Sequence, residues 1–399
     1  MAIDINSILS DNARNMRRSP VRGLLSRANA SQLISFAGGF PNQETFRVDD
    51  LKEIVREVLE NDAATALQYG PTEGNLKLRM LLAERYKAMG LVDITYENVI
   101  ITTASQQALD LCSRIFLNPD DTLICGLPSY LGALQSFWAC SAEPVGVREC
   151  DYMEEIVKKL ISAGKKPKFI YTIPDFSNPS GLTLTLEQRR QLIAIAFKYD
   201  LLVIEDSPYR ELRFDGEELP LIASLDSERV ILTGTFSKTF VPGFRLGWVI
   251  APINIIDKLV VAKQSADLCS SVFDQALVVK YMERGLFEAN IRSNINYYRK
   301  RRDKMLSLFD KYMPEGVSWT KPEGGLFLFV TLPEKCDAME LFNICLDRNL
   351  AFVAGEIFHC DGSGKNTLRI NYSYVDESKM EQGVQILSDS IKLRRSPYA

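Results

Sequence analysis

The chain has 399 residues, of which 46% are hydrophobic and 25% are charged, and its formal net charge at pH 7 is −4. This composition is typical of a globular protein and excludes wholesale disorder or collagen-like repetition. The near balance of charge gives no electrostatic reason to expect nucleic acid or an anionic membrane as a partner. His359 is the only histidine. A single histidine nearly excludes Ser-His-Asp chemistry and histidine-rich metal sites, so we expect proton transfer to fall to Lys, Tyr, Asp or Glu.

The cysteines and the N-terminus indicate a cellular compartment. The eight cysteines include no CxxC pair, so we expect neither a zinc site nor a disulfide framework, and no other spacing marks a metal site. The first residues contain no apolar stretch of the about 7–15 residues that an export signal needs. No run approaches the roughly 18 apolar residues of a membrane span. The sequence therefore predicts a cytoplasmic protein with no membrane partner.

The N-terminal third is expected to contain an arm and two helices. Residues 1–47 carry several arginines and a Gly38-Gly39 pair, and they read as an ordered arm. A helix is predicted from Asp49, with apolar residues on one face and Asp49 or Asp50 as its cap. A second helix is predicted over residues 75–88, ending before Gly90.

The central part alternates between β-branched apolar runs and helical patterns. Such alternation predicts βαβ units and a mostly parallel sheet with helices on both faces. Ligands bind outside the carboxyl ends of the strands in sheets of this kind. The predicted strands cover residues 99–103, 122–126, 169–173, 201–205, 230–233 and 248–251, with helices at 105–116 and 186–199 among them.

The pattern changes towards the C-terminus. Residues 287–313 predict one long helix, and its run Arg299-Lys300-Arg301-Arg302 is interpreted as a solvated face. Beyond Pro314, shorter strands and two further helices predict a second, α+β domain. The expected strands are residues 325–332 and 367–372, and the expected helices are 338–348 and 377–393.

Three polar segments follow predicted strands and are expected to meet at one edge of the sheet. The segments are Ser177-Asn178-Pro179-Ser180-Gly181, Glu205-Asp206-Ser207-Pro208-Tyr209 and Ser237-Lys238, the last continuing to Pro242-Gly243-Phe244-Arg245. A desolvated lysine has the lowered pKa that a Schiff-base amine needs. A carboxylate at the end of a buried strand needs a cationic partner. Taken singly, Lys238 could instead be a buried salt-bridge lysine and Asp206 a helix cap.

Together, these segments resemble the fold-type I pyridoxal-phosphate (PLP) aminotransferases of class I/II. The resemblance extends from Ala37-Gly38-Gly39-Phe40-Pro41-Asn42 to Leu368-Arg369-Ile370-Asn371-Tyr372. It looks closest to the 2-aminoadipate/kynurenine aminotransferase-like branch, on the segments 19–22, 69–74, 105–107 and 263–268. The resemblance implies an α/β fold with a large PLP-binding domain (residues 48–286) and a smaller α+β domain (287–399). Residues 1–47 would form an arm and substrate lid that packs with the small domain.

The resemblance also implies a role for each cofactor-binding residue. Lys238 would form the aldimine with PLP and then carry the proton, and Asp206 would pair with the pyridine nitrogen. Tyr209 and Asn178 would bind the 3-oxygen of the ring, on whose face Tyr130 would stack. The phosphate would be held by Ser105, Gln106, Ser237 and Arg245, and by Tyr69 of a neighbouring subunit.

The substrate side of the site is implied in the same way. Arg369 would bind the α-carboxylate of the amino acid, assisted by Asn178, while Gly39 and Arg22 would line the side-chain pocket. The reaction would be a ping-pong transfer of the amino group from an L-amino acid to a 2-oxo acid, in a homodimer with shared active sites. Arg22 and its basic neighbours could accept an acidic side chain or could equally be surface charge, whereas Phe40, Tyr130 and Phe358 would suit an aromatic or branched substrate, so the amino acid stays open. His359 has no assigned role.

Three alternatives were weighed. Another fold-type I PLP reaction, such as β-elimination or decarboxylation, would use almost the same residues. An aminotransferase-like transcription regulator would need a DNA-binding domain ahead of Gly38, where only 37 residues stand. A degenerate homologue without activity is disfavoured because the residues that carry the resemblance are all present.

Overall fold

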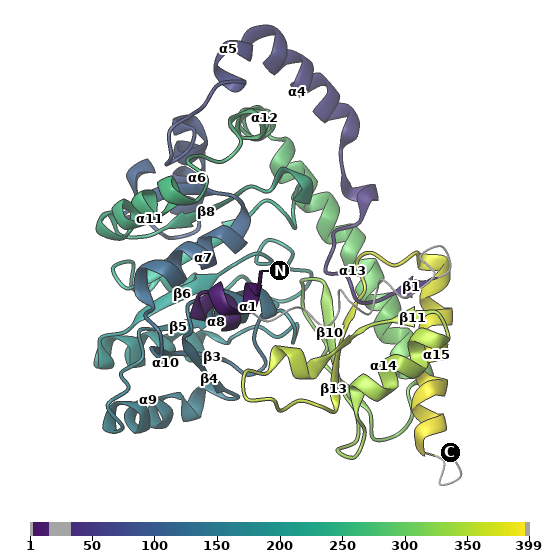
Figure 1. Ribbon diagram of the computed structural model, residues 1–399. Helices are drawn as coiled ribbons and strands as arrows, with labels where there is room; N and C mark the ends of the chain where they lie inside the picture. Colours follow the sequence, from purple (N-terminus) through teal and green to yellow (C-terminus); the bar gives the residue numbers. More distant parts are fainter. Residues whose placement is uncertain (1–2, 16–32, 396–399) are drawn as a thin grey trace.

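The computed structural model describes residues 3–15 and 33–395 (Figure 1). Its main body is a seven-stranded sheet with the order β2-β8-β7-β6-β5-β3-β4. Strands β4, β3, β5, β6 and β7 run parallel, and β8 pairs antiparallel with both β7 and β2. The strands are β2 (Val99–Thr102), β3 (Thr122–Gly126), β4 (Glu143–Val147), β5 (Phe169–Thr172), β6 (Leu202–Asp206), β7 (Val230–Thr235) and β8 (Gly247–Ile250).

Helices cover both faces of this sheet because the strands are apolar on both sides. Along β5, Phe169 and Tyr171 pack into one core cluster, and Ile170 packs into the other. The first cluster joins the sheet to α7 (Ala104–Phe116), α8 (Leu131–Ala139) and α11 (Ile253–Ala266). The second joins it to α6 (Leu76–Ala88), α9 (Met153–Ser162), α10 (Leu186–Tyr199) and α12 (Val272–Glu283). The predicted mostly parallel sheet flanked by helices is confirmed.

A smaller sheet lies beside the main body (Figure 1). Its order is β12-β13-β10-β9 and all its pairs are antiparallel. The long helix α13 (Leu286–Tyr312) leads to it from the main body. The strands of the smaller sheet are β9 (Ser318–Trp319), β10 (Phe327–Thr331), β12 (Val353–Ala354) and β13 (Thr367–Asn371), and the helices of this region are α14 (Ala338–Asp347) and α15 (Glu377–Arg395).

Part of the N-terminal segment lies beside the region of the smaller sheet. Strand β1 (Ile34–Ser35) pairs in parallel with β11 (Leu350–Ala351), and the following Phe36 is fully buried. Farther along, α4 (Val48–Asn61) and α5 (Ala63–Ala66) lie at one end of the molecule (Figure 1). The chain begins with the short helices α1 (Ile5–Ile8) and α2 (Asp11–Asn15). Among the described residues, no helix has both the length and the apolar character that crossing a bilayer requires.

The structure corrects three expectations. The run in α13 is not a uniformly solvated face, because Arg301 and Arg302 are buried and donate to the carbonyls of Tyr372 and Pro322 respectively. Helix α4 begins at Val48, so Asp49 and Asp50 lie in its first turn and neither caps it. Strand β4 was not predicted. It is an edge strand containing Pro144 and Gly146, two residue types that normally count against a strand.

Candidate active site

A cavity of about 720 Å³ opens at the carboxyl ends of strands β5, β6 and β7. It is lined by residues from the main sheet, from the N-terminal segment and from β13. Of the predicted site residues that the structure describes, all but Tyr69 contribute to this lining. The predicted residues in the lining are Gly39, Ser105, Gln106, Tyr130, Asn178, Asp206, Tyr209, Ser237, Lys238, Arg245 and Arg369.

Lys238 follows β7 and points its amine at the N-terminal segment. Its Nζ donates to the Gly39 carbonyl at 2.9 Å. Burial, followed by the positive charges of Arg369 and Arg245, lowers the pKa of Lys238 to about 8, while Asp206 acts in the opposite direction. The turn that carries the lysine is fixed because the Ser237 N–H donates to Thr235 Oγ1 at 3.1 Å. The lowered pKa increases the fraction of neutral, nucleophilic Lys238 amine near neutral pH.

Asp206 ends β6 and is 1% exposed. Its Oδ2 accepts a hydrogen bond from the Tyr171 hydroxyl at 2.9 Å. Its Oδ1 is buried without a hydrogen-bond partner among the described residues. Burial raises the pKa of Asp206 to about 7, against the lowering effects of Tyr171 and Lys238. A buried acceptor that lines a cavity and has no partner marks a place where a ligand donor fits.

Glu205 has a different environment from the one the sequence predicts. It is fully buried, and its two carboxylate oxygens accept from the backbone N–H groups of Ile222 and Ala223, at 3.2 and 2.8 Å. Burial raises its pKa to about 7. The expected cationic partner is therefore wrong for Glu205, because backbone amides satisfy the carboxylate instead.

Arg369 on β13 spans the smaller sheet, the main body and the N-terminal segment. Its Nη1 donates to Asn178 Oδ1 at 2.8 Å and its Nη2 to the Ala37 carbonyl at 2.6 Å. Its Nε is buried with no partner among the described residues. Phe327 and Phe358 stack on the guanidinium, at 4.4 and 5.2 Å from their ring centroids. Burial lowers the pKa of Arg369 to about 10, which leaves it charged at neutral pH.

An anion cradle lies at the N-terminus of α7. Ser105 and Gln106 belong to the first turn, where backbone N–H groups have no partner within the helix and the helix dipole is positive. The backbone of Gly247 passes so close that a Cβ there would lie 2.8 Å from Ser105 N. Ser237 and the exposed Arg245 line the same end of the cavity. This arrangement suits a phosphate group.

Three described residues that the sequence analysis names, Tyr69, Phe358 and His359, lie outside this lining. Tyr69 is 80% exposed and does not line the cavity, and Arg22 falls outside the described residues. Phe358 packs against Arg369 and does not line the cavity either, so its expected contact with the substrate is wrong. His359 is buried, its Nδ1 lies 2.9 Å from the Gly355 carbonyl, and its ring stacks on Phe329.

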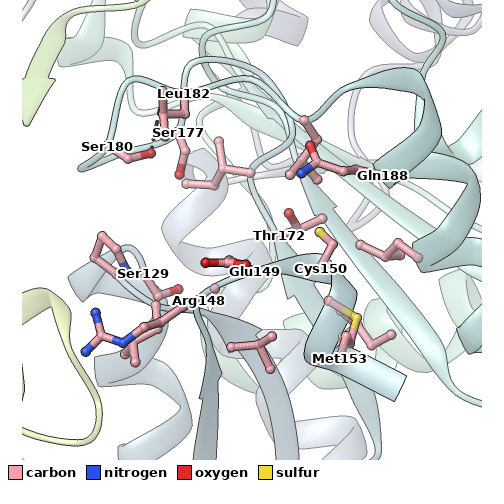
Figure 2. Close-up of a pocket in the computed structure, with 18 of the residues that line it drawn as sticks. Ser129, Arg148, Glu149, Cys150, Met153, Thr172, Ser177, Ser180, Leu182 and Gln188 are labelled. Carbon is pink, nitrogen blue, oxygen red and sulfur yellow. Dashed lines mark hydrogen bonds between the residues drawn. The ribbon is translucent and has the colours of Figure 1, made fainter. Parts of the chain in front are cut away.

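A second cavity, of about 490 Å³, adjoins the first and shares Tyr130 and Ile173 with it. Figure 2 shows Ser177, Ser180 and Leu182 on one side of this second cavity and Glu149, Cys150 and Met153 on the other. Tyr171, which the sequence analysis passed over, lines it as well. The signal that could have found Tyr171 is a phenol hydroxyl within a buried strand, which needs a hydrogen-bond partner.

The donor set of the first cavity fits PLP. The partnerless oxygen of Asp206 suits a protonated ring nitrogen, the α7 cradle suits a phosphate, and Lys238 suits a carbonyl carbon. The fold and the cavity thus define a PLP-dependent enzyme of the fold-type I class.

Comparison with known proteins gives the family. Residues 31–387 match the family model described as aminotransferase class I and II. The chain is 43% identical to aromatic-amino-acid aminotransferase 1 of Thermococcus litoralis, covering 98% of this chain and 95% of that protein. It is 36% identical to 2-aminoadipate transaminase of Thermus thermophilus, with 95% of each chain covered. The chain belongs to the class I and II aminotransferases, near the aminoadipate/kynurenine branch.

The solved structures agree. The crystal structure of Pyrococcus horikoshii kynurenine aminotransferase, in complex with PMP, superposes with a TM-score of 0.95 at 41% identity, covering 98% of this chain and 99% of that one. The α-aminoadipate aminotransferase of Thermus thermophilus, complexed with N-(5'-phosphopyridoxyl)-L-leucine, gives 0.90 at 34%, with 98% of each chain covered. The protein is therefore a PLP-dependent aminotransferase that acts on an amino acid and a 2-oxo acid, and the alternative of β-elimination or decarboxylation is not favoured.

Proposed function

We propose that the cavity at the ends of β5, β6 and β7 is where this chain performs transamination, with Lys238 as the covalent anchor of PLP and the acid/base group. The observation that carries this proposal is one cavity lined both by a partly buried lysine, whose pKa is lowered to about 8, and by a buried aspartate oxygen that has no partner among the described residues. Lys238 would hold PLP through its neutral amine, and, once the substrate had displaced it, the same amine would take the proton from the substrate α-carbon and pass it to the cofactor.

The other cofactor-binding roles that we propose are those that the family resemblance implies, and they are supported by the presence of each residue in the cavity lining. Asp206 binds the ring nitrogen, and Tyr209 and Asn178 bind the 3-oxygen. Tyr130 stacks on the ring face. The phosphate is bound by Ser105, Gln106, Ser237 and Arg245. PLP, when bound, supplies a ring that stabilises negative charge at the substrate α-carbon.

Arg369 is the proposed site for the substrate α-carboxylate, with Asn178 beside it and Gly39 along the side-chain pocket. The support is a charged, buried guanidinium that lines the cavity and keeps one N–H without a partner among the described residues. A carboxylate bound there would hold the substrate α-carbon near Lys238, whose Nζ already contacts Gly39. Arg22 stays a predicted lid residue.

We propose a homodimer because Tyr69 does not line the cavity of its own chain. Its side chain is 80% exposed and lies outside the lining, as expected of a residue that reaches the phosphate of a neighbouring subunit.

We also propose cytoplasmic location, no nucleic-acid or membrane partner, and the division of the chain into residues 1–47, 48–286 and 287–399. The separate seven-stranded and four-stranded sheets support that division.

The half-reaction tests the proposal. An amino acid added to the PLP-loaded protein should abolish the visible absorbance of bound PLP, and a 2-oxo acid should restore it. Lys238→Ala should show neither change, while Lys300→Ala, which alters an exposed lysine of α13, should behave as wild type. Failure of every 2-oxo acid to restore the absorbance would contradict transamination. A panel of amino donors with 2-oxoglutarate and pyruvate as acceptors would then identify the substrate.

A further inference from the structure

Tyr171 is a buried polar residue that contacts the active-site residue Asp206 from outside the cavity. It lies on β5, is 1% exposed, and donates its hydroxyl to Asp206 Oδ2 at 2.9 Å. It does not line the proposed active-site cavity, so it contacts neither cofactor nor substrate directly. It lines the adjoining second cavity.

The ring of Tyr171 is held in place independently of its hydroxyl. Phe137 on α8 packs edge-on against it, with ring centroids 5.5 Å apart and an interplanar angle of 73°. In the parallel pairing of β5 with β6, Tyr171 stands opposite Ile204, two residues before Asp206. Because strand register and ring packing fix its position, the hydroxyl has a defined partner in the Asp206 carboxylate.

We propose that Tyr171 is a positioning residue that occupies one oxygen of Asp206, and thereby presents the other oxygen, as a carboxylate, to the ring nitrogen of PLP. The inference rests on the proposed function of the cavity. It explains why Asp206 has one satisfied and one partnerless oxygen, although both are buried.

The electrostatic surroundings explain why this hydrogen bond matters. Burial alone favours the neutral acid, and the pKa of Asp206 is raised to about 7 even with its neighbours in place. Four titratable groups face Asp206: Tyr171 on β5, Lys238 after β7, Tyr209 after β6 and Tyr130 before α8. Only Tyr171 and Lys238 lower the pKa of Asp206. When Lys238 is neutral, the Tyr171 hydrogen bond is the remaining one of these interactions that favours the charged carboxylate.

The test compares two phenylalanine substitutions. Tyr171→Phe removes the hydroxyl and keeps the ring. Tyr199→Phe is the matched control, because the Tyr199 hydroxyl also donates to a carboxylate at 2.9 Å, that of Glu154 on the surface. The apoprotein of each variant is titrated with PLP between about pH 6 and 9, and the dissociation constant is read from quenching of protein fluorescence.

We expect wild-type affinity to fall as the pH drops through the Asp206 transition. In Tyr171→Phe, PLP should bind about tenfold more weakly at pH 7, since a hydrogen bond to a charged group is lost. The fall should also begin at higher pH, because the carboxyl group ionises later. Tyr199→Phe should match wild type at every pH.

A second measurement needs no cofactor. The carboxyl 13C signal of Asp206 in the apoprotein, assigned with Asp206→Asn, should titrate at higher pH in Tyr171→Phe than in wild type. If Tyr171→Phe does not fold, 3-fluorotyrosine placed at position 171 supplies a stronger donor, and the Asp206 titration should move to lower pH. An unchanged titration, or an equal loss of affinity at every pH, would overturn the positioning role. Wild-type protein that fails to bind PLP would instead contradict the proposed function.

Discussion

Glu205 and Asp206 are neighbours on one strand, both are buried, and burial raises the pKa of each to about 7. They differ in what their oxygens contact. Glu205 is satisfied by two backbone N–H groups, whereas Asp206 keeps one oxygen without a partner at the wall of a cavity. Adjacent residues of a strand face opposite sides of the sheet, so one carboxylate stabilises the fold and the other is left for a ligand. A perturbed pKa alone does not distinguish them, but the count of hydrogen-bond partners does.

The largest expected effect is on activity at Asp206. Asp206→Asn should lower kcat/KM by about 10²–10³-fold at saturating PLP, because a preorganised charge beside the cofactor ring is lost. The melting temperature of the apoprotein should not fall, because the substitution removes a buried charge with an unsatisfied oxygen. Activity within a few-fold of wild type would contradict the claim that Asp206, unlike Glu205, serves the cofactor.

Glu205 should show the reverse pattern. Glu205→Ala should lower the free energy of unfolding by about 3 kcal/mol, because two buried N–H groups lose their acceptors and a cavity opens. The kcat/KM of the folded fraction should stay close to wild type. Denaturant titration and active-site-normalised kinetics would check this, and a loss of activity without a loss of stability would be the opposite of the expected result.

The hydrogen-bond partners of two buried arginines, Arg189 and Arg369, can be compared in the same way. Arg189 is fully buried and bonded at Nε, Nη1 and Nη2, to the Leu184 and Pro220 carbonyls and to Asp175, whereas Arg369 leaves Nε free among the described residues. Arg369→Lys should raise the KM for the amino acid about tenfold or more, since lysine cannot bind a carboxylate bidentately. Arg189→Lys should lower the melting temperature and leave the KM unchanged. Steady-state kinetics that gave both variants the same KM would contradict this distinction.

The smallest effect is a pH dependence of stability. The ordinary pKa of an aspartate is 3.8 and that of folded Asp206 is about 7. Between these values the folded apoprotein holds more protons than the unfolded chain, so this group makes stability fall as pH rises. Asn does not titrate. The difference in unfolding free energy, Asp206→Asn minus wild type, should therefore increase from about pH 4 to pH 7 and stay constant above pH 7. The contribution of Glu205 is the same in both proteins, so it cancels in this difference. A difference that is constant over this range would count against a buried, ionisable Asp206.

Much of this arrangement could be predicted from the sequence. The alternation of strands and helices gave the main sheet, and the polar segments after β5, β6 and β7 gave most of the cavity. Only the family resemblance distinguished Asp206 from Glu205, because a sequence does not show which backbone amides will hydrogen-bond to Glu205. The buried arginines of α13 were misjudged because their partners, such as the Tyr372 and Pro322 carbonyls, come from distant loops. Tyr171 was missed for the same reason, since its partner lies on the next strand.

The most direct test of the account is to find where PLP attaches. Wild-type protein loaded with PLP is treated with borohydride, which makes the link between cofactor and lysine permanent, and the digested protein is mapped by mass spectrometry. The account predicts the pyridoxyl group on Lys238, with Lys263, a fully buried lysine of α11 that donates to Gln107 and Asp267, unmodified. A pyridoxyl group on another lysine, or on none, would contradict it.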